Sequence, residues 1–108
     1  MTGQPAPALV WCPFPDPDAA LAVIDALLQE GLIACGNVLP GMRSRFIWNG
    51  EVSSANEAGV LLKTNADCLS RVVARVAELH PYEEPAVLGW LADAAAPGTL
   101  EWLAQLGR

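Results

Sequence analysis

The sequence predicts a small α+β domain in which strands and helices follow the order strand, helix, strand, strand, helix, strand. Short apolar runs typical of buried strands alternate with stretches where apolar residues recur every three or four positions, as on a helix. The Asn49-Gly50 pair near the middle of the chain indicates a tight β-hairpin, because both residues accept positive φ angles. With 108 residues, the chain is expected to form a single domain spanning residues 1–108.

The first strand and the first helix are predicted in the N-terminal third of the chain. Residues 8–12 form a short apolar run closed by Pro13, which is typical of a buried strand. Asp16 can cap a helix whose first position is Pro17, and Gly31 ends the helical pattern. The apolar residues at helical spacing are Leu21, Ile24, Leu27 and Leu28. We expect the first eight residues to be disordered.

The centre of the chain is predicted to be a long hairpin. Residues 33–48 are extended with a break at Pro40-Gly41, and the return strand covers residues 51–64. At about 3.3 Å per residue, strands of about 16 and 14 residues reach roughly 45–50 Å, whereas the first and last strands have about five or six residues. The hairpin must therefore overhang the sheet, and its outer part carries Phe46 and Trp48.

A protruding hairpin with unpaired edges is a liability unless another strand pairs with it. We therefore expect it to pair with other copies of the chain in a cyclic homo-oligomer. The alternative is a mobile hairpin or a large bulge, which would leave its aromatic rings in water. The composition, with 53% hydrophobic and only 17% charged residues, also favours a surface that is buried between copies.

The second half of the chain supplies a helix, a strand and a short final helix. The second helix is predicted from near Asn65 to His80-Pro81, the last main strand over residues 86–91, and the final helix after Pro97. The helical apolar positions are Leu69, Val72, Val73, Val76 and Leu79, and in the final helix Trp102, Leu103 and Leu106. The whole order is that of the ferredoxin-like split βαβ sandwich, with a long central hairpin and a short C-terminal helix.

Charge and cysteine usage exclude several classes of function. The net charge of −6 disfavours nucleic acid, since phosphate binding needs a basic surface. No apolar run is long enough to span a membrane, and the N-terminus lacks the basic start of a secretory signal. Three cysteines without a short CxxC spacing argue against a disulfide framework, and they favour a reducing cytoplasm.

The best candidate for chemistry is the loop formed by residues 80–85, which holds the only histidine and the only tyrosine of the chain. The predicted topology brings the end of the first strand, with Cys12, to the same edge as His80. Cys35 and Cys68 are expected at the opposite edge. A thiolate and an imidazole, joined by the carboxylates of Glu83 and Glu84, would suit copper or zinc. The alternatives are a histidine that merely ends a helix and a cysteine that is simply buried.

The chain resembles the CutA divalent-cation-tolerance family over residues 9–106. The resemblance is carried by Leu32-Ile33-Ala34-Cys35-Gly36-Asn37-Val38-Leu39-Pro40-Gly41, Trp48-Asn49-Gly50-Glu51-Val52, Leu62-Lys63-Thr64, Leu79-His80-Pro81-Tyr82-Glu83 and Leu100-Glu101-Trp102-Leu103. It implies a cytoplasmic homotrimer that is assembled through the hairpin and involved in metal-ion tolerance. Copper binding is proposed for some members, and their ligands correspond to Cys12 and His80.

This chain departs from the family pattern at three places. Leu79 stands where some members have a second histidine, and Trp11 stands where threonine is frequent before Cys12. Residues 53–56, Ser-Ser-Ala-Asn, replace a stretch that is commonly acidic. The first departure either weakens a copper site or shifts its ligation to Glu83, Glu84 or another subunit.

Two further functions are considered beside a non-enzymatic metal-responsive trimer. The chain could be a trimeric sensor resembling PII-type proteins, which hold small anions or nucleotides between subunits, or it could be an assembly scaffold. The residues that would line such an inter-subunit cleft are Arg43, Arg45, Trp48, Glu51, Lys63 and Tyr82. Lys63 could instead extend its amine to solvent beside a carboxylate. An enzyme is the weakest alternative, because the one conceivable nucleophile pair, Cys12 with His80, carries no sign of activation.

Overall fold

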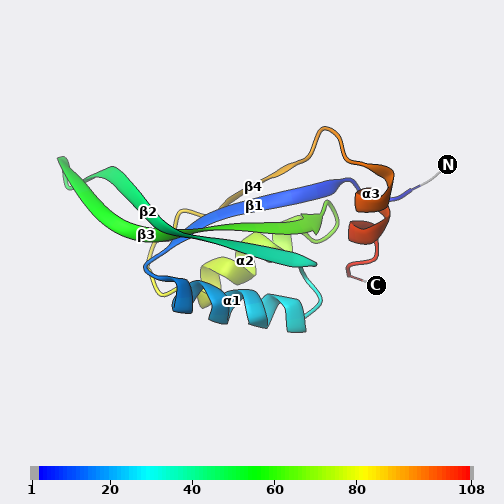
Figure 1. Ribbon diagram of the computed structural model, residues 1–108, viewed down its shortest axis with the longest axis horizontal. Helices are drawn as coiled ribbons and strands as arrows, with labels where there is room; N and C mark the ends of the chain where they lie inside the picture. Colours follow the sequence, from blue (N-terminus) through cyan, green and yellow to red (C-terminus); the bar gives the residue numbers. More distant parts are fainter. Residues whose placement is uncertain (1–2, 108) are drawn as a thin grey trace.

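The computed structural model describes residues 3–107 and shows a sheet with helices on one side (Figure 1). The body and a protruding hairpin together measure 52 × 26 × 22 Å. The elements in chain order are β1 (Pro7–Phe14), α1 (Pro17–Gln29), β2 (Cys35–Trp48), β3 (Glu51–Asn65), α2 (Leu69–Leu79), β4 (Leu88–Leu91) and α3 (Pro97–Ala104).

The four strands form one antiparallel sheet in the order β2-β3-β1-β4. This order and the alternation of elements confirm the predicted ferredoxin-like fold. The last strand lies beside the first, as expected, and Leu9 pairs with Trp90 in their register. The ends of β1 and α2 therefore meet at one edge of the molecule.

Helices α1 and α2 cover one face of the sheet, and the core lies between the two layers (Figure 1). Burial alternates along β1, which places every second side chain against the helices. The buried core residues of the strands are Val10, Cys12, Phe14, Val60 and Leu62, and those of the helices are Ala20, Val23, Ile24, Leu27, Val72 and Val76.

The opposite face of the sheet carries no helix over its centre. Trp11 lies there, over Gly59, where even a Cβ would come within 2.4 Å of the indole ring. Met42 approaches the same point from β2, since its sulfur would lie 3.1 Å from that Cβ. The indole thus packs directly on the backbone of β3, and the face around it consists largely of apolar side chains.

The β2–β3 hairpin extends well beyond the rest of the sheet, as predicted. Strand β1 pairs with residues 58–65 of β3, so residues 51–57 continue past it with only β2 as a partner. These seven residues span about 23 Å at 3.3 Å each. Asn49 and Gly50 turn the chain with φ of 50° and 80°, as the hairpin motif requires, and a register shift interrupts β2 between Leu39 and Met42.

The lengths of the outer strands differ from the prediction. Strand β1 continues through Pro13 because β4 pairs only with residues 8–11, so the missing amide hydrogen at Pro13 interrupts no ladder on that side. The expectation of disorder is wrong for Pro7 and Ala8, which belong to β1, while residues 1–2 lie outside the described part. Strand β4 begins at Leu88 rather than at residue 86.

The helices also differ in detail from the predicted pattern. Asp16 caps α1 through a 2.8 Å hydrogen bond from the Ala19 amide, as predicted. Leu21 and Leu28, however, are 47% and 42% exposed, because the helix face that packs on the sheet contains Ala20 and Val23 instead. Helix α2 begins at Leu69 instead of near Asn65.

The physical reason for the later start of α2 is the use that the fold makes of Asn65. Its side chain accepts a 3.0 Å hydrogen bond from the Cys68 amide, which closes a turn before the helix. Its amide group donates to the Leu103 carbonyl at 2.7 Å and so ties β3 to α3. In α3, Leu103 is buried while Trp102 is 46% exposed, so only the first of these packs inward.

Candidate functional site

The predicted juxtaposition of Cys12 and His80 at one edge is present, and His80 is its centre. The imidazole is only 7% exposed. Its Nδ1 accepts a hydrogen bond from the Tyr82 amide at 3.0 Å, and its Nε2 lies 2.8 Å from the Pro13 carbonyl oxygen. An amide can only donate and a carbonyl can only accept, so the proton is on Nε2 and the ring is neutral. Both ring nitrogens of His80 are therefore in use.

Two aromatic rings contact the same imidazole. The Phe14 ring stacks on it with centroids 4.2 Å apart, and the Tyr82 ring is tilted against it at 4.8 Å. The Tyr82 hydroxyl reaches back to the base of the hairpin, where it donates a 2.7 Å hydrogen bond to Glu57. His80 thus joins the end of β1, the loop after α2 and the hairpin.

Cys12 lies beside this cluster as a buried thiol. It has no exposed surface, and its sulfur lies 3.5 Å from the Pro13 carbonyl oxygen. Burial, with a smaller effect from the charge of Glu57, raises the pKa of the Cys12 thiol to about 12. A thiol with such a pKa is the opposite of an activated nucleophile, which argues against a Cys12–His80 catalytic pair.

The predicted metal ligands do not come together as a cation site within one chain. Glu83 and Glu84 are exposed, and residues 3–107 contain no group of three or more histidine, cysteine, aspartate or glutamate side chains placed to hold a metal ion. His80 has no free nitrogen and Cys12 is protonated. The arrangement of these four residues therefore does not fit a resident metal.

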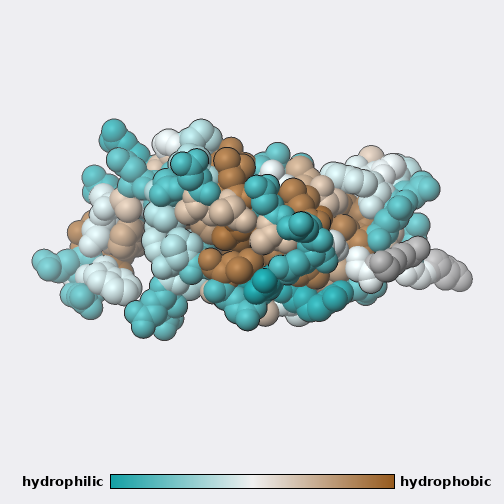
Figure 2. Space-filling model, turned by 90° about the horizontal axis from the view of Figure 1, so that it is seen from below, coloured by the Kyte–Doolittle hydropathy of each residue, from teal (hydrophilic) through white to brown (hydrophobic). Residues whose placement is uncertain are grey.

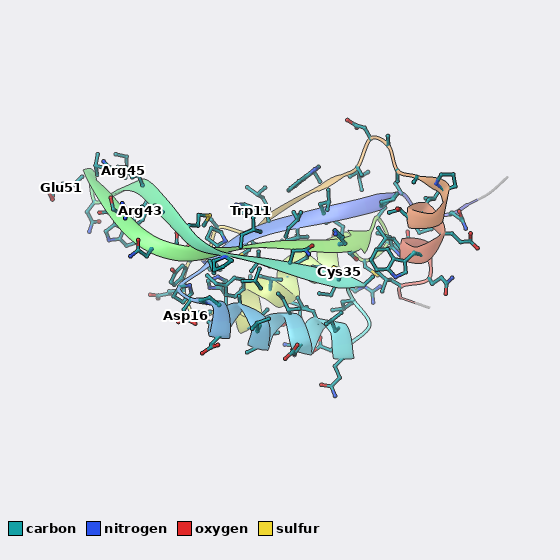
Figure 3. All side chains as sticks on the ribbon, in the orientation of Figure 1. Trp11, Asp16, Cys35, Arg43, Arg45 and Glu51 are labelled. Atoms are coloured by element: carbon teal, nitrogen blue, oxygen red, sulfur yellow. The ribbon has the colours of Figure 1, made fainter. Side chains whose placement is uncertain are left out.

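The residues predicted to line a ligand cleft are also spread out along the chain. Figure 3 shows Arg43 and Arg45 on the outer half of the hairpin, with Glu51 at its tip. Lys63 lies at the opposite end of the hairpin, paired with Cys35, and Tyr82 belongs to the His80 cluster. A cleft that uses all of them would have to be formed between chains.

Glu57 is the residue of this region that sequence reasoning missed. It accepts the Tyr82 hydroxyl and its charge acts on Cys12. The β1–β3 ladder ends with the pair Phe14 and Ala58, so a known register would have placed Glu57 at this edge of the sheet. Locating that end requires the register, which the apolar pattern alone does not provide.

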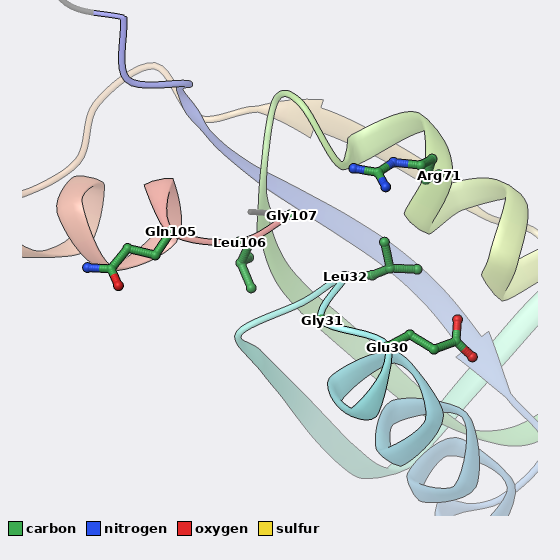
Figure 4. Close-up of a pocket in the computed structure, with 7 residues that line it drawn as sticks. All are labelled: Glu30, Gly31, Leu32, Arg71, Gln105, Leu106 and Gly107. Carbon is green, nitrogen blue, oxygen red and sulfur yellow. The ribbon is translucent and has the colours of Figure 1, made fainter.

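A separate cavity of about 370 Å³ lies at the far end of the molecule, where α1 ends (Figure 4). It is lined by Glu30, Gly31, Leu32, Arg71, Gln105, Leu106 and Gly107. The Glu30 carboxylate is already engaged by Arg75 at 2.8 Å. The Arg71 guanidinium lies 3.6 Å from the buried sulfur of Cys68. Cys68 therefore lies away from the His80 edge, and so does Cys35, which Figure 3 shows at the far end of β2, as predicted.

The fold and the site together define a class: small ferredoxin-like α+β proteins with a long protruding hairpin and a histidine-centred edge. The pattern of the CutA1 divalent ion tolerance proteins matches residues 8–106, almost the whole chain. The chain belongs to the CutA1 family.

Individual relatives agree with this assignment. The Divalent-cation tolerance protein CutA of Pyrococcus horikoshii is 38% identical over 95 residues, covering 88% of this chain and 92% of its own. The crystal structure of CutA from Xylella fastidiosa superposes with a TM-score of 0.87 at 32% identity, covering 91% of this chain and 94% of that one. The chloroplastic Protein CutA of Arabidopsis thaliana is 30% identical over 88% of this chain and 52% of its own length. Within residues 3–107, no helix is both long and apolar enough to cross a membrane.

Proposed function

We propose that the protein acts in divalent-cation tolerance as a non-enzymatic, cytoplasmic homotrimer. The family membership supports the role in tolerance. The observation that carries the trimer is the uncovered apolar face of the sheet, which is continuous with one face of the protruding hairpin. The proposed cytoplasmic location is based on the cysteine usage of this chain alone. The relatives do not decide it, because the Arabidopsis protein is named for the chloroplast.

The uncovered face can be identified from the strand register. Residues paired across strands share a face, so the neighbours of Trp11 in the ladders, Leu61 and Leu88, lie on its side of the sheet. Leu39 and Trp90 join them through their pairing with Gly59 and Leu9. Leu88 is 56% and Leu39 49% exposed. Monomeric proteins rarely leave such a contiguous apolar surface in water, and second copies of the same chain would cover it.

The hairpin extends this face outward. Met42 touches the Trp11–Gly59 contact, and Phe46 and Trp48 follow it at even positions on the same side of the strand. Trp48 is 62% exposed. A neighbouring chain that packs on this side would bury both aromatic rings and pair the open edge of β2.

The cation in this proposal is copper or another divalent ion, and it is not an obligatory cofactor. An ion at Cys12 and His80 would have to displace the thiol proton and at least one hydrogen bond of the imidazole. Its binding would therefore be weak and would fall as the pH is lowered. Isothermal titration with Cu(II) tests these ligands, and equal affinity in a His80→Ala variant would remove His80 from the proposed site.

The proposed function itself is tested by mass and by growth. Native mass spectrometry should give about 34 kDa, three times the chain mass of 11.4 kDa. Expression in a bacterial strain without its own member of this family should restore growth under copper stress. A Trp48→Glu variant should do neither, because it places a charge in the proposed interface. A native mass of one chain, or growth restored equally by the variant, would contradict the proposal.

A further inference from the structure

The outer hairpin carries two arginines on one of its faces and its carboxylates on the other. Arg43 pairs with Asn56 and Arg45 with Ser54 across the two strands. Because side chains alternate between the faces of a β-ribbon, these four residues share one face. Glu57 pairs with Met42 and Glu51 with Trp48, so both acidic residues point to the opposite face.

The two guanidinium groups are not neutralised within the described part of the chain. Arg75 is bound by the carboxylates of Glu30 and Glu78, whereas residues 3–107 offer no ion pair or hydrogen bond to the side chain of Arg43 or Arg45. Two positions along one strand separate their backbones by about 6.6 Å, so two like charges stand close together. Such a pair in a chain of net charge −6 creates a local site of positive potential.

A small cleft lies at these residues. It has a volume of about 170 Å³ and is lined by Arg43, Ser44, Arg45, Ser54, Ala55 and Asn56. The guanidinium groups can only donate hydrogen bonds, and on the same face of the ribbon the Ser54 hydroxyl and the Asn56 side-chain amide can donate as well. No carboxylate lines it. The cleft therefore offers several donors and two positive charges to one small acceptor.

We propose that this cleft binds a phosphate group, either as inorganic phosphate or as the terminal phosphate of a small metabolite. Arginine recognises phosphate by paired, charge-assisted hydrogen bonds, and two arginines can hold different oxygens of one group. The cleft volume suits a single phosphate rather than a whole nucleotide, so any remaining part of a metabolite would project into solvent.

The cleft lies on the face of the ribbon opposite the aromatic rings of the proposed interface. Phe46 and Trp48 are at even positions on β2, and Arg43 and Arg45 are at odd ones, so the apolar interface and the cleft use opposite faces of the ribbon. Figure 2, viewed from the side of the helices, shows a small hydrophobic patch among hydrophilic side chains on the hairpin at the left. Ile47 and Val52 pair with each other on the same face as Arg43 and Arg45, and both are exposed.

The test is a titration of the full-length protein at low ionic strength with inorganic phosphate and, separately, with ADP, followed by amide chemical shifts. We expect shifts at residues 43–45 and 54–56 with either ligand and none with adenosine. An Arg43→Gln/Arg45→Gln double variant should bind about ten-fold more weakly or not at all. Arg71→Gln, which removes an arginine at the far end of the molecule, should bind like the wild type.

Each outcome decides the question. Shifts with phosphate alone would assign the free ion, and tighter binding of ADP would assign a phosphorylated metabolite. Binding that is equal in the double variant, or equal for adenosine, would overturn the proposal. The proposal would also be overturned if the wild type showed no shifts with phosphate and the double variant had the native mass of one chain. The arginines would then serve contacts between copies.

Discussion

At the scale of single residues, His80 stands out in the sequence and in the structure, but for different reasons. The sequence marks it as the only imidazole of the chain, which favours a ligand. The structure uses it as a neutral bridge between the Pro13 carbonyl and the Tyr82 amide. The difference arises because hydrogen-bond partners on the backbone leave no trace in residue identity.

The position of Tyr82 can be measured through its ionisation. Burial, then the hydrogen bond to Glu57 and its negative charge, raise the pKa of Tyr82 to about 12. The phenolate is thus disfavoured in the folded protein, so this group's contribution to stability is present below pH 10 and is lost as the pH rises toward 12. Because Tyr82 is the only tyrosine, the phenolate band in the near-ultraviolet absorbance, where thiolates do not absorb, reports its pKa during a pH titration.

Two variants test whether the contact with Glu57 contributes to the raised pKa of Tyr82. Glu57→Gln removes the negative charge and should lower the pKa while leaving the fold intact. His80→Ala removes the acceptor of the Tyr82 amide and should also move the pKa toward 10, because the ring is no longer held against Glu57. A wild-type titration with a midpoint at 10 would show that this cluster does not form.

At the scale of elements, the tip of the hairpin depends on one backbone conformation. Gly50 has φ of 80°, in the left-handed region where a Cβ is unfavourable. Gly50→Ala should therefore lower the free energy of unfolding by about 1 kcal/mol in urea denaturation. Gly98→Ala is the matched control, since Gly98 lies in α3 with open space around it and alanine is the better helix former. Equal effects of both changes would argue against the tight turn.

The elements themselves were largely predictable, while their ends and faces were not. Asn49-Gly50 identified the hairpin and Asp16-Pro17 the start of α1, because these motifs act locally. Asn65 predicted a start of α2 that is too early. Its side chain instead accepts a hydrogen bond from the Cys68 amide in the preceding turn and donates one to the distant Leu103 carbonyl. Leu21 fits a helical stripe yet remains exposed, because only tertiary packing decides which stripe faces the sheet.

The candidate site shows the same division. The topology alone brought Cys12 near His80, since a β-α-β-β-α-β order fixes which ends meet. It could not show that the loop would turn Glu83 and Glu84 to solvent. Nor could it show that Glu57 would reach Tyr82, because that contact depends on where the β1–β3 ladder stops.

At the scale of the whole molecule, two leucine side chains of similar exposure have different surroundings. Leu88 is 56% exposed on the sheet face without helices, and Leu21 is 47% exposed on α1, which lies on the other side of the molecule (Figure 1). Isolated apolar residues on a surface are ordinary, whereas Leu88 is part of the contiguous face around Trp11. Only the contiguous face that contains Leu88 is expected to be covered by partner chains.

This contrast predicts how stability depends on concentration. If three chains unfold together, each tenfold rise in protein concentration should add about 0.9 kcal/mol per chain to the free energy of unfolding, since two association steps are shared by three chains. Leu88→Glu should abolish this dependence and reduce the native mass to one chain. Leu21→Glu introduces the same charge at a similarly exposed leucine and should leave both unchanged. Unfolding midpoints in urea at two protein concentrations measure the effect, and a wild-type midpoint that does not move would mean that the uncovered sheet face is stable in water.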